Sequence, residues 1–207
     1  MPETHRMAGP ICRVEHEFTA FQVNGLGLVS HFNRKARHHS RCRLRRGRTV
    51  SKLAAIASEG KVYGLDYSQT CVAVAAKTNR RWMEMGRVEI REAPVSQLPF
   101  SDNMFDLVTA VETHFWWPDI PEGMREVLRV LKPGGALLIV AEIYKGANTR
   151  TAKLAEKYLP LSGIKLLSVT EHQELFADAA YWDVQVIADS NKGWICGIGK
   201  KPSGPTD

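Results

Sequence analysis

The 207-residue sequence lacks long apolar runs, closely spaced cysteines and any aspartate before Asp66. Without a run of about 20 apolar residues it holds no membrane-spanning helix, and its first residues contain no apolar core of signal-peptide length. The four cysteines are far apart and form no C-x-x-C pair, which argues against a disulfide framework and against the common zinc spacings. We therefore expect a cytoplasmic protein that binds no metal.

The positive charge of the chain is confined to its beginning. Residues 1–48 contain ten Lys and Arg and three acidic residues, whereas the net charge of the whole chain is only +6. A basic arm that binds nucleic acid is one interpretation of this asymmetry. The segment has no heptads, no Cys/His metal spacing and little aromatic interleaving, so we do not expect nucleic acid as a partner. The sequence does not indicate an oligomeric state.

From Gly47 onwards, apolar patterns with the strand period and the helix period alternate, with short links between them. We predict strands over residues 61–66, 88–93, 105–111, 136–142, 183–190 and 193–201. We predict helices over residues 49–60, 69–86, 118–135, 149–159 and 170–182. This order is typical of a Rossmann-like, doubly wound α/β sheet that is mostly parallel, with an antiparallel C-terminal hairpin strand. The predicted segments are an atypical basic region (1–46), the α/β domain (47–201) and a disordered tail (202–207).

Acidic residues end two of the predicted strands. Asp66 lies nineteen residues after Gly47, close to the spacing at which an acid binds the ribose hydroxyls of a nucleoside cofactor. An ordinary turn residue at a strand end is the alternative for Asp66. Glu92 and Ala93 lie at the end of the next strand, where an adenine edge would be bound, and a solvated loop acid is equally consistent. Ser68 is placed to cap the following helix.

A run of aromatic and titratable residues, 111–119, follows the predicted strand 105–111. Ligands of open α/β sheets bind beyond the carboxyl ends of the strands, so this run is directed towards a pocket. His114 is a candidate to take a proton from a substrate nucleophile, and Trp116 or Trp117 to contact a cationic ligand. The equally weighted alternative is that the tryptophans pack under a loop and that His114 is a hydrogen-bonded surface histidine.

Three segments together resemble the class I S-adenosylmethionine-dependent methyltransferases, in particular the small-molecule, type 11-like group. They are VYGLDYS, LPFSDNMFDLVTAVETHFWWPD and LRVLKPGGALLIVAE. The resemblance implies a seven-stranded sheet with an antiparallel last strand, S-adenosylmethionine as cofactor, and methyl transfer to a small molecule. It also implies a cofactor site made of Gly47, Asp66, Tyr67, Ser68, Glu92, Ala93, Val111 and Glu112. Within this set, Asp66 would bind the ribose and Tyr67 would flank the adenine.

The first glycine motif of this family, D-V-G-C-G-G, has no match, because residues 41–46 read R-C-R-L-R-R. A shifted reading frame joins the last two bases of each codon of residues 41–46 to the first base of the next codon. This frame permits the sequence D-V-G-C-G-G, in register with Gly47. Our hypothesis is that a segment beginning near His16 and ending at Arg46 is translated out of frame. GC-rich DNA read out of frame yields arginine, which would explain the basic composition. The coding DNA across residues 10–50 tests the hypothesis. The absence of triplets that encode D-V-G-C-G-G in the shifted frame would contradict it.

Methyl transfer to a small-molecule acceptor is thus the function that the sequence predicts. A non-catalytic or defective methyltransferase-like protein with impaired cofactor binding is the main alternative. A nicotinamide-dependent reductase and a nucleic-acid-binding arm on an α/β domain are weaker ones. Residues 143–168 lie between the fifth strand and the last helix. We expect this segment to cap the pocket and to select the acceptor.

Overall fold

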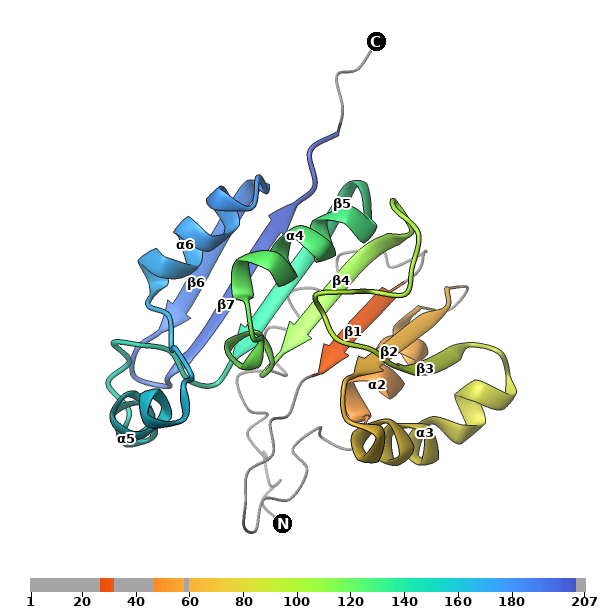
Figure 1. The fold of residues 1–207 in the computed structure, drawn as a ribbon, viewed down its shortest axis with the longest axis horizontal. Coiled ribbons are helices and arrows are strands. Elements are labelled where there is room, and N and C mark those ends of the chain that lie inside the picture. Colours follow the sequence, from red (N-terminus) through yellow and green to blue (C-terminus); the bar gives the residue numbers. More distant parts are fainter. Residues whose placement is uncertain (1–26, 32–46, 58–59, 204–207) are drawn as a thin grey trace, which may run out of the picture.

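The computed structural model describes residues 27–31, 47–57 and 60–203. They form one seven-stranded sheet in the order β3-β2-β1-β4-β5-β7-β6 with helices on both faces (Figure 1). The strands are β1 (Gly27–His31), β2 (Val62–Asp66), β3 (Val88–Glu92), β4 (Phe105–Val111), β5 (Leu131–Ala141), β6 (Trp182–Asp189) and β7 (Trp194–Lys200). The helices are α2 (Arg48–Ile56), α3 (Gln69–Glu84), η2 (His114–Trp116), α4 (Ile120–Val130), α5 (Arg150–Tyr158), η3 (Leu159–Ser162) and α6 (Val169–Asp178).

Strand direction divides the sheet into a parallel part and an antiparallel hairpin. β1 pairs in parallel with β2 and β4, and β4 pairs in parallel with β5. β7 pairs antiparallel with both β5 and β6. The turn between β6 and β7 contains Gly193, whose φ of 83° favours glycine. The predicted α/β class, with a mostly parallel sheet and an antiparallel C-terminal hairpin, is confirmed.

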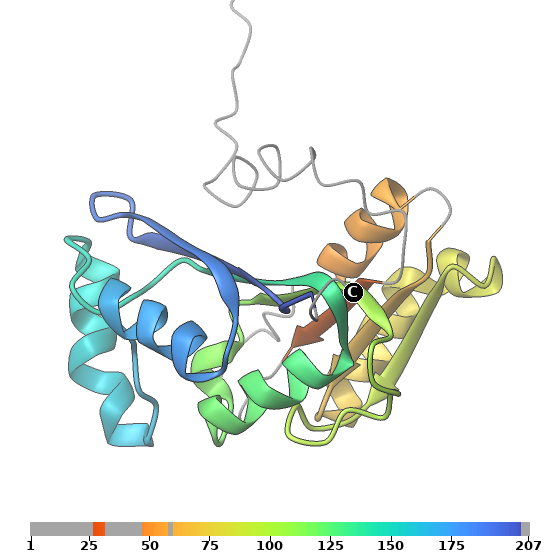
Figure 2. The ribbon, with the colours of Figure 1, turned by 90° about the horizontal axis from the view of Figure 1, so that it is seen from above.

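The helices cover opposite faces of the sheet. Figure 2 shows α2 on one face and α4 and α6 on the other. α2 packs against α3, where the Trp82 Nε1 donates to the Ser51 Oγ at 3.2 Å. On α2, Val50 and Ala54 are buried and Ala57 follows them into the core, while Ile56 is 45% exposed. Ala57 therefore continues the buried stripe of α2, and Ile56 does not.

The middle of the sheet contains a strand that the sequence did not predict. β1 lies between β2 and β4, in the place where a chain without a first strand would have a hole. Its five residues show no clear period-two pattern, so sequence periodicity gave no signal. The rest of the predicted basic region, including residues 41–46 and most of the segment in the frame hypothesis, lies outside the described residues. So do residues 204–207 of the predicted tail.

The helix predicted over residues 118–135 was expected to stop at the glycines before the strand, whereas the structure includes Leu131–Gly135 in β5. α4 ends at Val130, and Leu131 pairs with Phe105 before the register shifts. The bend remains visible, because Gly134 has a φ of 77°. A Cβ on Gly135 would lie 2.9 Å from the Phe105 carbonyl oxygen. The glycines therefore form an irregularity within the strand, and the expected helix stop is displaced by a few residues.

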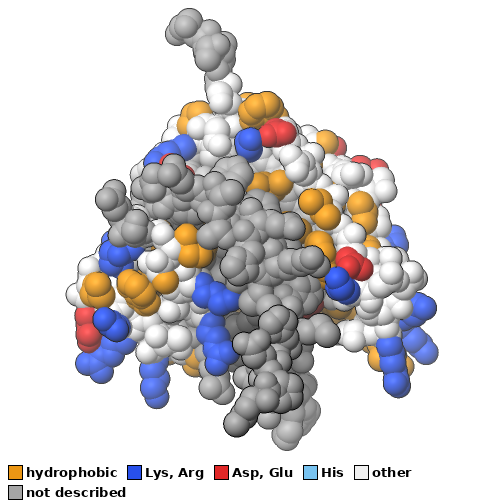
Figure 3. Space-filling model, turned by 180° about the vertical axis from the view of Figure 1, so that it is seen from behind, with side chains coloured by type: hydrophobic (Ala, Val, Ile, Leu, Met, Phe, Trp, Pro, Cys, Tyr) orange, Lys and Arg blue, Asp and Glu red, His pale blue; other side chains and the backbone are white. Residues whose placement is uncertain are grey.

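The surface formed by the described residues mixes apolar and basic side chains. Figure 3 shows one face, on which Lys and Arg side chains are interspersed with apolar ones. The most exposed large apolar side chain is that of Leu161, at 82%, next to Tyr158 at 53%. Among the described residues, no helix combines the length and the apolar character needed to cross a membrane.

Candidate functional site

The predicted ligand-binding residues meet at the carboxyl edge of the parallel strands. Asp66 ends β2 and is paired in register with Glu92, which ends β3. On the other side of β1, Val111 ends β4. The chain runs from β1 towards β2 and β3 on one side and returns to β4 on the other. Such a reversal of strand order is where open α/β sheets bind ligands.

Asp66 combines burial with an unused carboxylate oxygen. Its side chain is almost fully buried, and its Oδ1 accepts a hydrogen bond from the Ser68 backbone N–H at 2.9 Å. Its Oδ2 is buried and has no hydrogen-bond partner among the described residues. Burial raises the pKa of Asp66 to about 6, and hydrogen bonds with the Ser68 backbone and the Cys71 side chain oppose this shift. A hydroxyl donor of a ribose fits this oxygen.

The residues expected at the adenine and the ribose lie beside one another. The Ala93 backbone N–H donates to the Asp66 carbonyl oxygen at 3.1 Å, while Glu92 is exposed. Tyr67 is half-buried and packs against the main apolar core. Ser68 stands at the N-cap of α3, but its side chain makes no capping hydrogen bond, contrary to the expectation. Its backbone instead fixes the Asp66 carboxylate.

Gly47 is used for helix packing. It is the N-cap of α2, has a φ of 73°, and its carbonyl oxygen accepts from the Asn79 Nδ2 at 3.0 Å. A Cβ on Gly47 would lie 2.6 Å from the Asn79 Nδ2 and 3.0 Å from the Ala75 Cα. A role for Gly47 in cofactor binding stays a prediction. Asn79 was missed, because a single asparagine within a helical pattern gives no signal of its partner.

Glu112 links the ends of two neighbouring strands. Its backbone has a φ of 60°, and its N–H donates to the Val140 carbonyl oxygen at 2.8 Å. Its side-chain Oε1 accepts a hydrogen bond from the Glu142 backbone N–H. A positive φ on a residue other than glycine is strained and common at ligand sites. Binding of the methionine part of a cofactor by Val111 and Glu112 stays a prediction.

His114 is buried, at 1% exposure, so the expectation of a surface histidine is wrong. It opens the short helix η2 directly after β4, and its Nε2 lies 3.0 Å from the Nε2 of His172 on α6. Burial, and then the neighbouring His172, lower the pKa of His114 well below its usual value. His172 was missed, because no motif contains it and the two residues lie 58 positions apart.

The two tryptophans after His114 differ in their surroundings. Trp117 is buried in the main core, and its ring lies 2.6 Å from where a Cβ on Gly123 would be. The glycine therefore lets α4 approach the ring closely. Trp116 is half-buried and contacts two apolar clusters. The alternative in which this pair packs under the loop is confirmed for Trp117.

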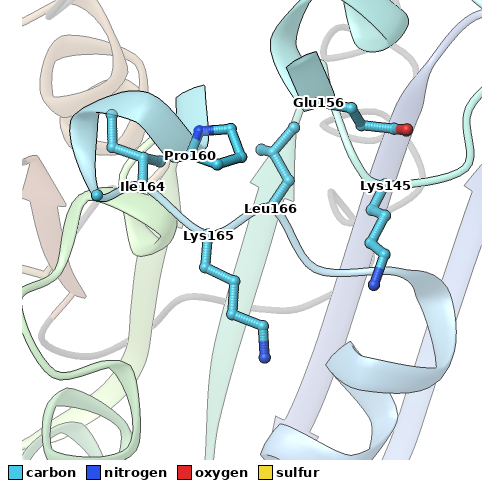
Figure 4. Close-up of a pocket in the computed structure, with 7 residues that line it drawn as sticks. Lys145, Glu156, Pro160, Ile164, Lys165 and Leu166 are labelled. Atoms are coloured by element: carbon cyan, nitrogen blue, oxygen red, sulfur yellow. The ribbon is translucent and has the colours of Figure 1, made fainter. Parts of the chain in front are cut away.

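The segment 143–168, which the sequence predicts to cap the pocket, follows β5. It contains α5 and η3 and borders a cavity of about 430 Å³. Figure 4 shows the lining side chains, among them Lys145, Lys165 and Leu166. The lysine Nζ atoms each lie 3.3 Å from a Glu171 carboxylate oxygen. The predicted cofactor residues do not line this cavity, so a capping role of the segment 143–168 stays a prediction.

Both the sequence and the fold of the chain resemble those of known proteins. Residues 45–139 match the family model of a methyltransferase domain. A methyltransferase of Aquifex aeolicus, described as dependent on S-adenosylmethionine, superposes with a TM-score of 0.68 over 93% of this chain and 90% of its own, at 16% identity. The chain is therefore similar to a methyltransferase domain over residues 45–139, and it shares the fold of the Aquifex aeolicus enzyme.

Individual relatives resemble parts of the chain. A demethylmenaquinone methyltransferase of Bacillus mycoides is 37% identical over 90 residues, which are 44% of this chain and 38% of the relative. The match therefore spans well under half the length of that curated relative. The [4+2]-cyclase SpnF has the same fold, with a TM-score of 0.70 and 18% identity, over 94% of this chain and 80% of its own.

Proposed function

We propose that the chain transfers a methyl group from S-adenosylmethionine to a small-molecule acceptor. The buried Asp66 carboxylate supports this proposal most directly. One of its oxygens is held by the Ser68 backbone and the other has no partner among the described residues. A buried, ionisable acceptor without a donor is costly unless a ligand supplies one. The ribose hydroxyls of the cofactor are such donors.

Each of the residues at the carboxyl edge would bind a different part of the cofactor. Asp66 would accept from the ribose, Glu92 and Ala93 would meet the adenine edge, and Glu112 would lie at the methionine part. When bound, the cofactor supplies a methyl group on a sulfonium, which is already electrophilic. The protein therefore contributes mainly proximity and orientation. His114 is the candidate base when the acceptor nucleophile carries a proton.

Calorimetric titration of the full chain with S-adenosylmethionine tests the cofactor site. Asp66→Asn keeps an acceptor for the Ser68 N–H and removes the charge, so we expect roughly 10- to 100-fold weaker binding, the value of a charge-assisted hydrogen bond. Asp183→Asn is the matched control, because Asp183 pairs with Lys200 at the far edge of the sheet. Equal affinity of the Asp66→Asn variant and the native chain would contradict the role of Asp66.

A defective methyltransferase-like protein is the rival, favoured by the absence of the glycine motif between β1 and α2. In that case the chain is folded but does not bind S-adenosylmethionine. Replacing residues 41–46 together by D-V-G-C-G-G then restores binding. The native chain and this six-residue variant are compared in the same titration. Equal micromolar affinity of both chains would contradict the rival.

A different reaction on the same fold is a further alternative, because SpnF is described as a [4+2]-cyclase. Fold alone does not determine the reaction. Incubation with S-adenosylmethionine labelled in its methyl group separates the two. Label transferred to a small molecule supports methyl transfer, whereas conversion of a substrate without transfer of label supports the alternative.

A further inference from the structure

Three exposed apolar side chains follow one another along α5 and η3, and we call them the apolar stripe. Leu154, Tyr158 and Leu161 are 47%, 53% and 82% exposed, and their spacing of four and three residues places them on one helical face. Seven large apolar side chains are exposed among the described residues, and the other four are spread over α2, the end of α3 and β6. Exposed apolar side chains that gather in one place mark interaction sites, whereas scattered ones do not.

The opposite face of α5 attaches the helix to the domain. Ala152, Ala155 and Leu159 belong to one apolar cluster with the buried Ile164. The Thr149 side chain caps the helix by accepting from the Ala152 backbone N–H at 3.1 Å. Because this inner face already anchors the helix, the apolar stripe on the outer face is not needed for the core.

The end of η3 brings Leu161 to the tip of a turn. Gly163 has a φ of 72°, and the Ile164 backbone N–H donates to the Leu159 carbonyl oxygen at 3.2 Å, so the chain reverses directly after Leu161. Figure 1 shows α5 at the lower left corner of the molecule. A flat partner can therefore reach the apolar stripe.

The segment 143–168 around the apolar stripe is strongly basic. It contains five Lys and Arg residues and one acidic residue, whereas the rest of the range 60–203 contains 12 Lys and Arg and 16 Asp and Glu. The acidic residue is Glu156, and its Oε1 accepts from the Gly146 backbone N–H at 2.6 Å. The apolar stripe therefore lies in a local positive region of a domain that is otherwise acidic.

Three of the basic residues lie on α5 beside the apolar stripe. Arg150, Lys153 and Lys157 are exposed, and among the described residues they pair with no carboxylate. The other two, Lys145 and Lys165, share the Glu171 carboxylate at 3.3 Å each. The outer face of α5 thus combines apolar side chains with basic groups that are available to an anionic partner.

We propose that α5 and η3 form a docking surface for a bilayer that contains anionic lipids. The apolar stripe enters the boundary between headgroups and acyl chains, and the basic side chains lie against the lipid phosphates. This contact is peripheral, because no described helix has the length and apolar character to span a membrane.

Charge and apolar character together favour a bilayer over the other occupants of this surface. A second copy of the chain would bring two basic surfaces together, and their repulsion opposes such a contact. A nucleic acid would neutralise the basic residues but leave the three apolar side chains in water. Only a bilayer surface offers negative charge and an apolar interior at once. The docking surface does not depend on the proposed function.

Co-sedimentation of the full chain with lipid vesicles, in the absence of any cofactor, tests the docking. Vesicles with equal parts of phosphatidylglycerol and phosphatidylcholine should bind the chain at least roughly tenfold more tightly than vesicles of phosphatidylcholine alone. Binding to the anionic vesicles should weaken as the salt concentration rises. Equal binding to both kinds of vesicle, or binding to neither, would overturn the proposal.

Leu161→Ser tests the apolar contribution and should weaken binding to the anionic vesicles by roughly tenfold. The substitution leaves the core intact, because the Leu161 side chain is in solvent. Ile56→Ser is the control. Ile56 is about as exposed as Leu154, at 45%, but lies on α2. Its replacement should leave vesicle binding unchanged, and an equally small effect of Leu161→Ser would contradict insertion of the apolar stripe.

Replacement of both Lys153 and Lys157 by Gln tests the basic contribution. Each basic residue near an anionic surface contributes roughly a factor of five, so we expect roughly 10- to 30-fold weaker binding to the anionic vesicles. Replacement of both Lys77 and Arg81 by Gln is the control, because these exposed residues have the same spacing on α3. Equal losses in the two double variants would show that only the total charge matters, against the role of α5.

Two further measurements on the full chain distinguish the rival occupants. Sedimentation velocity reports self-association, and titration with a DNA duplex reports nucleic-acid binding. We expect a monomer that binds the vesicles more tightly than the duplex. A dimer that is lost in the Leu161→Ser variant, or tighter binding to the duplex, would overturn the proposal. Calorimetry with S-adenosylmethionine is a separate readout, so a failure of the proposed function leaves the vesicle result unaffected.

Discussion

Asp66 carries an energetic cost that its neighbours only partly offset. The change in its pKa from 3.8 to about 6 corresponds to about 3 kcal/mol between its charged and neutral forms. In the folded chain the carboxyl group takes up a proton as the pH falls through about 6, whereas in the unfolded chain it does so near 3.8. This residue therefore makes the fold more stable as the pH falls from 7 to 4, and less stable above pH 6.

Asp66→Asn should raise the free energy of unfolding at pH 8 by about 1–2 kcal/mol, since the buried charge is removed and the new amide is incompletely paired. Urea unfolding at pH 8 and pH 5 measures this. The difference between variant and native chain should shrink at pH 5, where the native Asp66 is largely protonated. A difference that grows towards low pH would contradict the raised pKa.

Two glycines with similar backbone angles differ in their surroundings. Gly47 has a φ of 73° and no room for a Cβ, while Gly86 has a φ of 71° and open space around it. Gly86→Ala should cost about 1 kcal/mol from backbone strain alone. Gly47→Ala should cost roughly 2–4 kcal/mol, because overpacking against Asn79 adds to the strain. Equal losses in chemical unfolding would show that the contact with α3 is unimportant.

At the residue scale, the sequence predicted the places of single residues along the strands better than their contacts with distant residues. Asp66 and Ala93 were placed at strand ends by periodicity, and the structure brings them together. The contact between these two residues can be predicted from the strand order alone. His172 and Asn79 depend on how a helix docks against a distant segment, and no local pattern encodes that docking. The burial of His114 depends on the same docking and was missed for the same reason.

At the level of elements, one arginine fastens the loop between β3 and β4 to α4. The Arg129 guanidinium donates to the carbonyl oxygens of Leu98 and Phe100 and to the carboxylates of Asp102 and Glu126. A planar group with five donors satisfies these partners at once, which a lysine does not do. The loop therefore has a fixed position although it contains no regular structure.

Arg129→Lys should lower the free energy of unfolding by about 1–3 kcal/mol, because two backbone carbonyls lose their donor. Arg80→Lys is the control. Arg80 forms an exposed pair with Glu84, one helical turn away, and pairs of this kind contribute about 0.3–0.5 kcal/mol. Thermal unfolding of both variants measures the difference. Similar small losses would mean that the loop is held by its apolar residues instead.

Elements from Gly47 onwards were predicted well, because buried strands and amphipathic helices have clear periods. β4 was predicted with its observed bounds, since both of its faces are covered and its residues are continuously apolar. β1 was missed because it is short and has no such pattern. The start of β5 was placed too late, since a Pro-Gly-Gly sequence indicates a turn while pairing with β4 keeps it in the sheet.

For the whole molecule, β1 makes the basic N-terminal region part of the fold. Its pairing with five residues of β2 and four of β4 joins the two halves of the sheet. A chain without residues 1–46 should therefore lose cooperative unfolding, because β2 and β4 are left without a common partner. Circular dichroism during heating measures this, and a chain without residues 204–207 serves as control. Unchanged cooperativity in the shorter chain would show that β1 is dispensable.

The position of β7 also has a consequence for synthesis on the ribosome. Among the described strands β7 is made last, yet it lies between β5 and β6 and pairs with both. Until residues 194–200 leave the exit tunnel, β5 has an exposed edge and β6 has no partner in the sheet. Contacts of this separation in sequence close late, and unpaired edges promote aggregation. A nascent chain of this protein should thus depend on chaperones until β7 is released.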